Sequence, residues 1–145
     1  MNDASIGIEL ANPGHELGYR AFPEPQIAAL EALCRDILAR HPIPPRHVLG
    51  HSDVAPERKQ DPGERFPWAR LARADIGLWP EPALPWAPAQ AEAERLLMAI
   101  GYGAAARGSI LTAFQRHFRP ERCDGLLDEE TARRIAAVAA LCGEV

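Results

Sequence analysis

The sequence lacks the cysteine patterns that define several classes of small protein. Its three cysteines, Cys34, Cys123 and Cys142, are an odd number and contain no CxxC spacing. Cys34 lies on an apolar helical face and is expected to be a small buried hydrophobe. Whether Cys123 and Cys142 pair depends on the fold, so the sequence leaves that pairing, and the compartment, open.

Long apolar runs and basic clusters are also missing. No run approaches the roughly 18 apolar residues needed to span a membrane. Residues 1–10 show no basic stretch followed by an apolar one, so no signal peptide is visible. The net charge is −4, and no basic patch is interleaved with aromatic residues, which argues against nucleic acid as a partner. The sequence does not indicate an oligomeric state.

Proline is abundant, with 14 residues in 145, and it divides the chain. Residues 77–89 contain four prolines and are expected to form a semi-rigid linker. Residues 90–145 are predicted to form a small three-helix domain, with Ser109 capping its second helix and Asp128 its third. His117 in this domain is expected to be an isolated, partly exposed helix residue.

Residues 1–76 are predicted to form an α/β domain. The segment Ser5–Ala11 alternates apolar and other residues, which is typical of a strand. An amphipathic helix is expected from Pro25 to Ala39, followed by a short strand from His47 to Gly50. This order predicts a mixed sheet flanked by helices, with functional residues at the ends of strands.

The stretch GHSDVAPERKQDPG, residues 50–63, concentrates polar and titratable side chains after the second predicted strand. His51 and Asp61 are donors that suit Zn²⁺, and Lys59 adds a cation between them. Glu9 is an unusual mid-strand carboxylate, which suggests a functional role. The alternative is that residues 50–63 form an ordinary polar loop and that Glu9 is simply solvated.

Three segments resemble a known family when they are read together. They are SIGIELAN, FPEPQ and IPPRHVLGHSDVAPERKQDPGERFPW, within residues 4–72. They resemble the zinc-dependent N-acetylmuramoyl-L-alanine amidases of type 2, which are related to peptidoglycan recognition proteins. The segments ILTAFQRHFRP and DGLLDEETARRI are similar to a C-terminal three-helix peptidoglycan-binding module.

The resemblance implies a role for each candidate residue. His51 and Asp61 would be zinc ligands, Glu9 the base that acts on the zinc-bound water, and Lys59 the cation that faces the developing oxyanion. The implied reaction is hydrolysis of the amide between N-acetylmuramic acid and L-alanine in peptidoglycan or its fragments. The alternatives are a non-catalytic peptidoglycan-binding protein with a degenerate amidase domain, and a poorly folding remnant. The implied location is the bacterial cell envelope, or alternatively the cytoplasm.

One departure from the family pattern concerns the metal. The family has another zinc-binding histidine on a strand upstream of the glutamate, whereas here the glutamate is already residue 9. We therefore expect an N-terminally incomplete domain that lacks its first strand or strands, or a different third ligand. The nearest candidate is His15, on the loop after Glu9, which could otherwise border the substrate groove.

Overall fold

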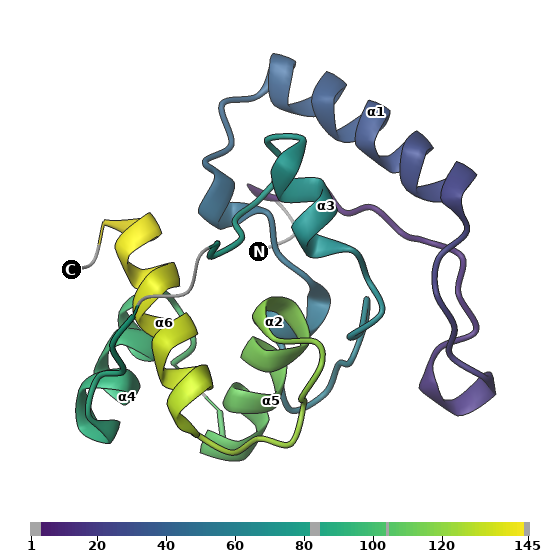
Figure 1. Cartoon of the computed structure of the whole chain (residues 1–145). Helices are drawn as coiled ribbons and strands as arrows, with labels where there is room; N and C mark the ends of the chain where they lie inside the picture. Colours follow the sequence, from purple (N-terminus) through teal and green to yellow (C-terminus); the bar gives the residue numbers. More distant parts are fainter. Residues whose placement is uncertain (1–3, 82–84, 104, 144–145) are drawn as a thin grey trace.

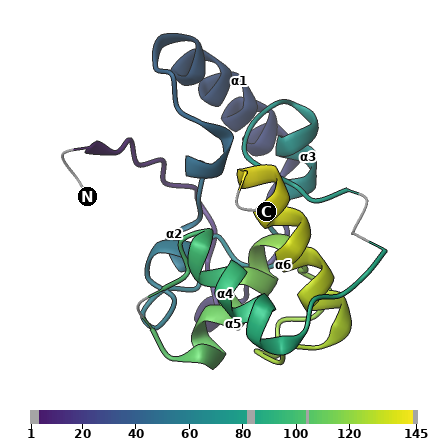
Figure 2. The ribbon, with the colours of Figure 1, turned by 90° about the vertical axis from the view of Figure 1, so that its left-hand side faces the viewer.

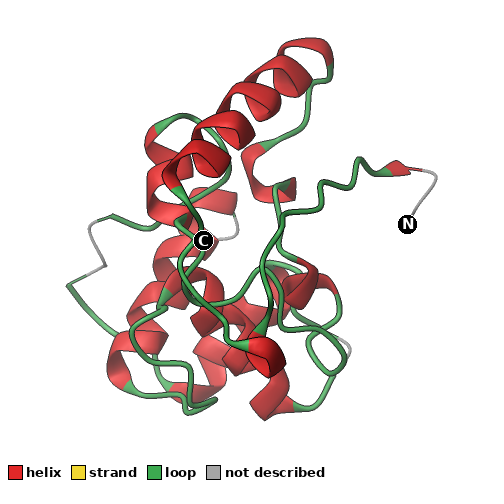
Figure 3. Ribbon diagram, turned by 90° about the vertical axis from the view of Figure 1, so that its right-hand side faces the viewer, coloured by secondary structure: helices red, strands yellow, loops and turns green. Residues whose placement is uncertain are grey.

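The computed structural model describes residues 4–81, 85–103 and 105–143, and their regular structure is entirely helical (Figures 1 and 3). Within these ranges the 3₁₀ helices η2 and η3 accompany six α-helices. The elements are η2 (His15–Leu17), α1 (Glu24–Arg40), η3 (Pro45–His47), α2 (His51–Val54), α3 (Trp68–Arg73), α4 (Gln90–Ala99), α5 (Arg107–Phe118) and α6 (Glu129–Cys142). Within the described ranges, no helix is long and apolar enough to cross a membrane.

The predicted mixed sheet is wrong for the part of the chain that the structure describes, where no strand occurs. The segment 5–11 is extended and projects away from the helices (Figure 2). Ile6 and Ile8 on its alternating face are 51% and 38% exposed. A strand needs a neighbouring strand to complete its hydrogen-bond ladder, and sequence alternation cannot supply one.

The second predicted strand, His47 to Gly50, is also absent: His47 ends a 3₁₀ turn, and residues 48–50 are extended or irregular and pair with no described strand. Pro45–His47 forms η3, and His51 begins α2 after an extended N-cap at Gly50. The predicted order of strand, helix and strand is therefore replaced by α1 followed by the short helical turns η3 and α2. The loop that contains the candidate residues is held by these turns and not by the edge of a sheet.

The first hydrophobic core lies between α1, α3 and the chain around them. The amphipathic helix predicted from Pro25 to Ala39 is confirmed as α1. Its apolar stripe in the sequence is buried or partly buried except for Leu33, which is 44% exposed; the stripe consists of Ile27, Leu30, Leu33, Cys34, Ile37 and Leu38. Arg70 of α3 joins the two helices, with its Nε donating to Glu31 Oε1 at 2.6 Å. The buried residues of this core are Ile27, Leu30, Cys34, Phe66, Trp68, Leu71 and Ile76.

The second core is formed by α4, α5 and α6, as the sequence predicted. Asp128 caps α6, since its side chain accepts a hydrogen bond from the backbone N–H of Thr131. The predicted cap at Ser109 is wrong, because α5 already begins at Arg107. The N–H of Ala106 before it is instead bound by Glu57 Oε1 at 2.8 Å.

The two cores are packed against each other, and the linker takes part in this contact. Trp79 packs against both cores, and α2 lies against α5 (Figure 1). Trp86, the second linker tryptophan, is 53% exposed. Residues 82–84 of the predicted linker lie outside the described residues. Among the described cysteines, Cys34 is buried as expected, and no disulfide joins Cys123 to Cys142.

Candidate functional site

The structure brings together the two predicted metal ligands. His51 is the first residue of α2, and Asp61 lies on the loop ten positions later. His51 Nδ1 is 3.1 Å from Asp61 Oδ2, with side chains that are 50% and 62% exposed. The loop is fixed against the helix by the N–H of buried Ser52, which donates to the carbonyl of Asp61 at 2.9 Å. The pair is therefore open to solvent on a fixed backbone.

The separation of this donor pair is that of an ordinary N–H···O hydrogen bond, and it is also compatible with two ligands of a tetrahedral zinc ion. Zinc bonds to nitrogen and oxygen of about 2.0–2.1 Å place neighbouring ligand atoms of a tetrahedron about 3.3 Å apart. The observed 3.1 Å separation is close to that edge. In the described ranges, however, no group of three or more histidine, cysteine, aspartate or glutamate residues could hold a metal. The fit therefore extends to two ligands.

The two predicted catalytic residues do not contact this pair in the described structure. Lys59 is half-buried two positions before Asp61, and its N–H donates to the carbonyl of Ala55 at 3.0 Å. Glu9 is exposed on the extended segment 5–11. No hydrogen bond or ion pair between described residues joins Glu9 or Lys59 to the pair, so both roles remain predictions.

His15 lies beside the loop but is engaged elsewhere. Its Nε2 is 2.9 Å from Glu64 Oε2, and its ring stacks on Tyr19 with centroids 4.3 Å apart. The Tyr19 hydroxyl in turn donates to the carbonyl of Pro62 at 2.8 Å and accepts from the N–H of Arg65. Within the described residues His15 therefore braces the loop that carries Asp61, rather than completing a metal site.

A buried polar network lies beneath the same loop. Asp53 Oδ2 accepts from the N–H of Gly50 at 2.7 Å and lies 2.8 Å from His117 Nδ1. The Tyr102 hydroxyl donates to Asp53 Oδ1 at 2.6 Å. Burial, and then the charge of Asp53, raise the pKa of Tyr102 well above its ordinary value, so the phenol stays protonated. Asp53 thus has one partner at the N-cap of its own helix, Gly50, and two partners, Tyr102 and His117, in the segment that contains the C-terminal helices.

The expectation of a partly exposed His117 is wrong. Its side chain is 2% exposed, and its ring lies between Trp68 and Phe118, at centroid distances of 3.8 and 3.9 Å. The burial of His117 could not be predicted from its neighbours in sequence, because its partner Asp53 is 64 positions away. The apolar pattern around it on α5 was the only available signal, since it places position 117 among buried neighbours.

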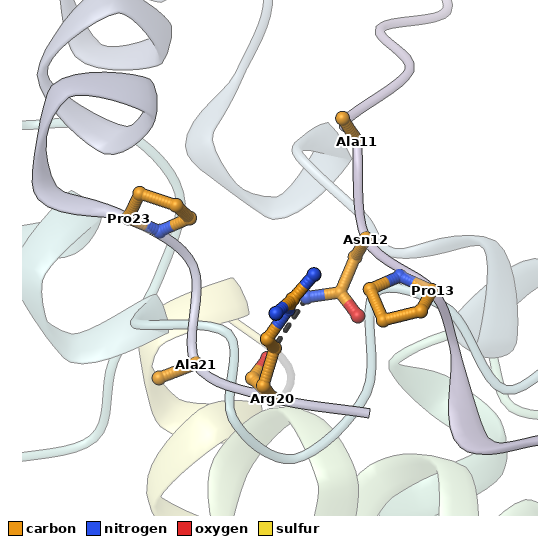
Figure 4. Close-up of a pocket in the computed structure, with 6 residues that line it drawn as sticks. All are labelled: Ala11, Asn12, Pro13, Arg20, Ala21 and Pro23. Carbon is orange, nitrogen blue, oxygen red and sulfur yellow. Dashed lines mark hydrogen bonds between the residues drawn. The ribbon is translucent and has the colours of Figure 1, made fainter. Parts of the chain in front are cut away.

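A hollow of about 440 Å³ lies between the two segments of chain that flank η2. It is lined by residues before η2 and before α1, and Asn12 points toward Arg20, whose carbonyl accepts from Asn12 Nδ2 at 2.8 Å (Figure 4). The lining contains none of the predicted site residues. Its residues are Ala11, Asn12, Pro13, Arg20, Ala21 and Pro23.

Comparison with known proteins gives a consistent result. Residues 1–64 match the Amidase_2 family model, described as N-acetylmuramoyl-L-alanine amidase. The chain is 39% identical over 152 residues to the N-acetylmuramoyl-L-alanine amidase AmiD of Escherichia coli, covering 90% of this chain and 55% of AmiD. It is 41% identical over 70 residues to the 1,6-anhydro-N-acetylmuramyl-L-alanine amidase AmpD of Enterobacter cloacae, covering 48% and 35% of the two chains.

Solved structures agree with the sequence matches. The structure resembles E. coli AmiD in complex with the substrate anhydro-N-acetylmuramic acid-L-Ala-D-gamma-Glu-L-Lys, with a TM-score of 0.86 and 37% identity. That match covers 99% of this chain and 64% of the AmiD chain. AmpDh3 of Pseudomonas aeruginosa gives a TM-score of 0.77 at 37% identity, covering 86% and 56%. This chain therefore spans 55% of AmiD and 35% of AmpD in the curated matches.

Proposed function

We propose that this chain is part of an N-acetylmuramoyl-L-alanine amidase, which hydrolyses the amide between N-acetylmuramic acid and L-alanine in peptidoglycan or its fragments. The observation that carries the proposal is the 3.1 Å approach of His51 Nδ1 and Asp61 Oδ2 on a fixed, solvent-open loop. The family match over residues 1–64 includes both residues. The substrate bound to AmiD, a muramyl tripeptide with γ-linked D-glutamate, supports muropeptide fragments as the substrate class.

His51 and Asp61 would hold a zinc ion, together with a ligand outside the described pair. When bound, zinc supplies Lewis acidity that lowers the pKa of water to about 7 and makes it a nucleophile at neutral pH. An imidazole and a carboxylate are ordinary zinc donors, and the exposure of both side chains leaves the substrate free to approach. The reaction would therefore take place beside His51 at the start of α2 and Asp61 on the loop that follows this helix.

Glu9 would transfer the proton between the attacking water and the leaving amine, and Lys59 would balance the negative charge that forms on the carbonyl oxygen. An amide is a poor electrophile, so its hydrolysis needs a base for the attacking water and an acid for the leaving amine. The Glu9 carboxylate would take the first proton and return it to the nitrogen of L-alanine. The ammonium group of Lys59 would stabilise negative charge on the carbonyl oxygen, an effect typically worth about 3–4 kcal/mol per donor.

A second candidate function is peptidoglycan binding without catalysis. It is favoured by the observation that the described residues bring two metal donors together, where a catalytic zinc takes three protein ligands. The C-terminal helices would then serve as a peptidoglycan-binding module. In this case the chain would retain insoluble peptidoglycan but release no peptide from it.

Zinc content and hydrolysis distinguish these functions. We expect about one zinc per chain after dialysis against a weak chelator, lost in His51→Ala and kept in His41→Ala, which removes an exposed histidine after α1. The loaded chain should release L-Ala-γ-D-Glu-L-Lys from the anhydro-muramyl tripeptide. A folded chain that binds peptidoglycan, retains no zinc and releases no peptide would contradict the proposed amidase function. It would support the second candidate function, peptidoglycan binding without catalysis.

A further inference from the structure

A groove of about 430 Å³ lies where the candidate catalytic loop meets the C-terminal helices. One wall is the loop 56–60, and the other is the side of α5 that runs from Gly108 in its first turn to Arg116 in its last; α5 packs beside α2 (Figure 1). Three cationic side chains line it, namely Arg58 and Lys59 from the loop and Arg116 from α5. Polar side chains of Ser109 and Thr112 complete the α5 wall.

These three cations form no ion pair with a described carboxylate, as is also true of Arg20, Arg65 and Arg73, although Arg116 interacts electrostatically with Glu64 beyond ion-pair distance. By contrast, Arg70, Arg95 and Arg134 each form an ion pair with a glutamate. The side chains of Arg58, Lys59 and Arg116 form no hydrogen bond or ion pair with any described residue. The carboxylate in the lining, Glu57, already accepts the N–H of Ala106. With three cations and the one carboxylate of Glu57, the lining carries a net charge of +2 in a chain of net charge −4.

Arg116 gives an independent indication that a ligand is needed. Its Nε is buried and has no hydrogen-bond partner among the described residues. A buried donor without a partner costs about 1–3 kcal/mol, and such groups in folded proteins usually find one. A carboxylate that entered the groove would satisfy this donor and bring the complementary charge. The Nε atoms of Arg119 and Arg133 are buried without a partner as well, but of these three arginines it is Arg116 that lines the groove, where an anionic ligand can reach it.

We propose that this groove binds the free carboxylates of the substrate's peptide stem, with Arg116 as the main contact and Arg58 beside it. The proposal rests on the amidase function proposed above. Lys59 lines the groove and is also the residue expected to face the scissile carbonyl. A peptide spans about 3.3–3.6 Å per residue, so the residue after L-alanine would lie within the adjoining groove.

The linkage of the stem explains why a carboxylate is available there. A D-glutamate joined through its γ-carboxyl keeps its α-carboxylate free, one residue beyond the amide that is cut. Arginine binds carboxylates through two parallel N–H donors, which gives orientation as well as affinity. Since Arg116 belongs to α5, the C-terminal helices would contribute directly to substrate recognition.

The test compares two tripeptides against the whole chain by calorimetry. The first is L-Ala-γ-D-Glu-L-Lys, and the second is the same peptide with D-isoglutamine, whose α-carboxylate is replaced by a neutral amide. We expect the amide to weaken binding to the wild-type chain about tenfold, and Arg116→Gln to weaken binding of the first peptide about tenfold. Binding of the isoglutamine peptide should be insensitive to Arg116→Gln, because the interacting charge is already gone.

Two further variants keep the test decisive. Arg116→Lys retains the charge and should recover part of the affinity, and Arg73→Gln removes an exposed arginine of α3 and should change nothing. The proposed carboxylate site would be overturned by any of three results: equal affinities for the two peptides, an Arg116→Gln variant that binds the first peptide as the wild type does, or no binding by the folded wild type. If Arg116→Gln hydrolysed the substrate with an unchanged KM, the proposed carboxylate site would be wrong and the amidase function would stand. Tripeptide binding without any hydrolysis would overturn the amidase function alone.

Discussion

Asp53 and His117, 64 positions apart in sequence, form a buried acid–histidine pair with 2.8 Å between Oδ2 and Nδ1. Their side chains are 3% and 2% exposed. Asp53 lies two residues after His51 in α2, so this pair connects the candidate metal ligand directly to α5. The C-terminal helices therefore support the loop on which His51 and Asp61 meet, and are not merely attached through a linker.

Removing the carboxylate of Asp53 should destabilise the whole chain. Asp53→Ala leaves His117 Nδ1, the Gly50 N–H and the Tyr102 hydroxyl without their partner, and breaking a buried pair costs about 3–5 kcal/mol. The measurement is urea unfolding at neutral pH. Asp36→Ala is the control, because its exposed pair with Arg40 should contribute about 0.5 kcal/mol or less. Similar losses in both variants would contradict a special role for Asp53.

Gly63 should be intolerant of any side chain. Its φ of 86° lies in the left-handed region, and an added Cβ would lie 2.5 Å from the Tyr19 hydroxyl oxygen. We expect Gly63→Ala to cost about 1–2 kcal/mol from the backbone alone, and more from the clash. The substitution should also weaken zinc binding, because Tyr19 fixes the backbone just after Asp61. Thermal unfolding and zinc content would measure the two effects.

The control for Gly63 is another glycine with free space around it. Gly7→Ala meets nothing within 4 Å, and Gly7 does not have a positive φ. We expect this variant to melt and bind zinc like the wild type. A Gly63→Ala chain that behaved in the same way would show that the loop can rearrange without affecting the site.

Features that depend on neighbouring residues could be predicted from the sequence, and those that depend on distant ones could not. The cap of α6 at Asp128 and the apolar stripe of α1 are local, and both predictions are confirmed apart from exposed Leu33. The strand predicted at Ser5–Ala11 failed because alternation describes faces and not the partner that a strand requires.

The candidate site shows the same division. The pairing of His51 with Asp61 follows from a short loop and was predicted from the sequence. The Asp53–His117 pair and the groove at Arg116 arise where α2 meets α5, which no local pattern reveals. His117 was missed because a histidine on a helix has no distinguishing spacing of its own.

Acid should destabilise the chain through Asp128. Partial burial would raise the pKa of this carboxyl, but hydrogen bonds from Arg119 and Thr131 outweigh it and lower the pKa from 3.8 to about 2. A carboxyl whose pKa is lower in the folded state than in the unfolded state stabilises the fold at any pH above its unfolded-state pKa. That contribution is lost as the pH falls through the folded-state pKa. We therefore expect the melting temperature to drop between about pH 4 and pH 2, and to drop less in Asp128→Asn.

Asparagine suits this experiment because it can still cap a helix while removing the charge. Glu129→Gln, the next residue along, removes an exposed i,i+4 pair with Arg133 and serves as the control. Its melting temperature should follow the wild-type curve with pH. An Asp128→Asn chain with the same pH dependence as the wild type would assign the acid sensitivity to other carboxylates.

Glu9 provides the most direct test of the proposed chemistry, because its role in catalysis can be separated from metal binding. It is exposed and makes no hydrogen bond or ion pair with described residues, so Glu9→Ala should leave the melting temperature and zinc content unchanged. Loss of a general base typically lowers the rate by about 10²–10⁴-fold, so hydrolysis of the anhydro-muramyl tripeptide should fall by that factor. Glu16→Ala, which removes an exposed glutamate in η2, is the control and should retain full turnover. If Glu9→Ala kept zinc and turned over substrate at the wild-type rate, another group would have to accept the proton.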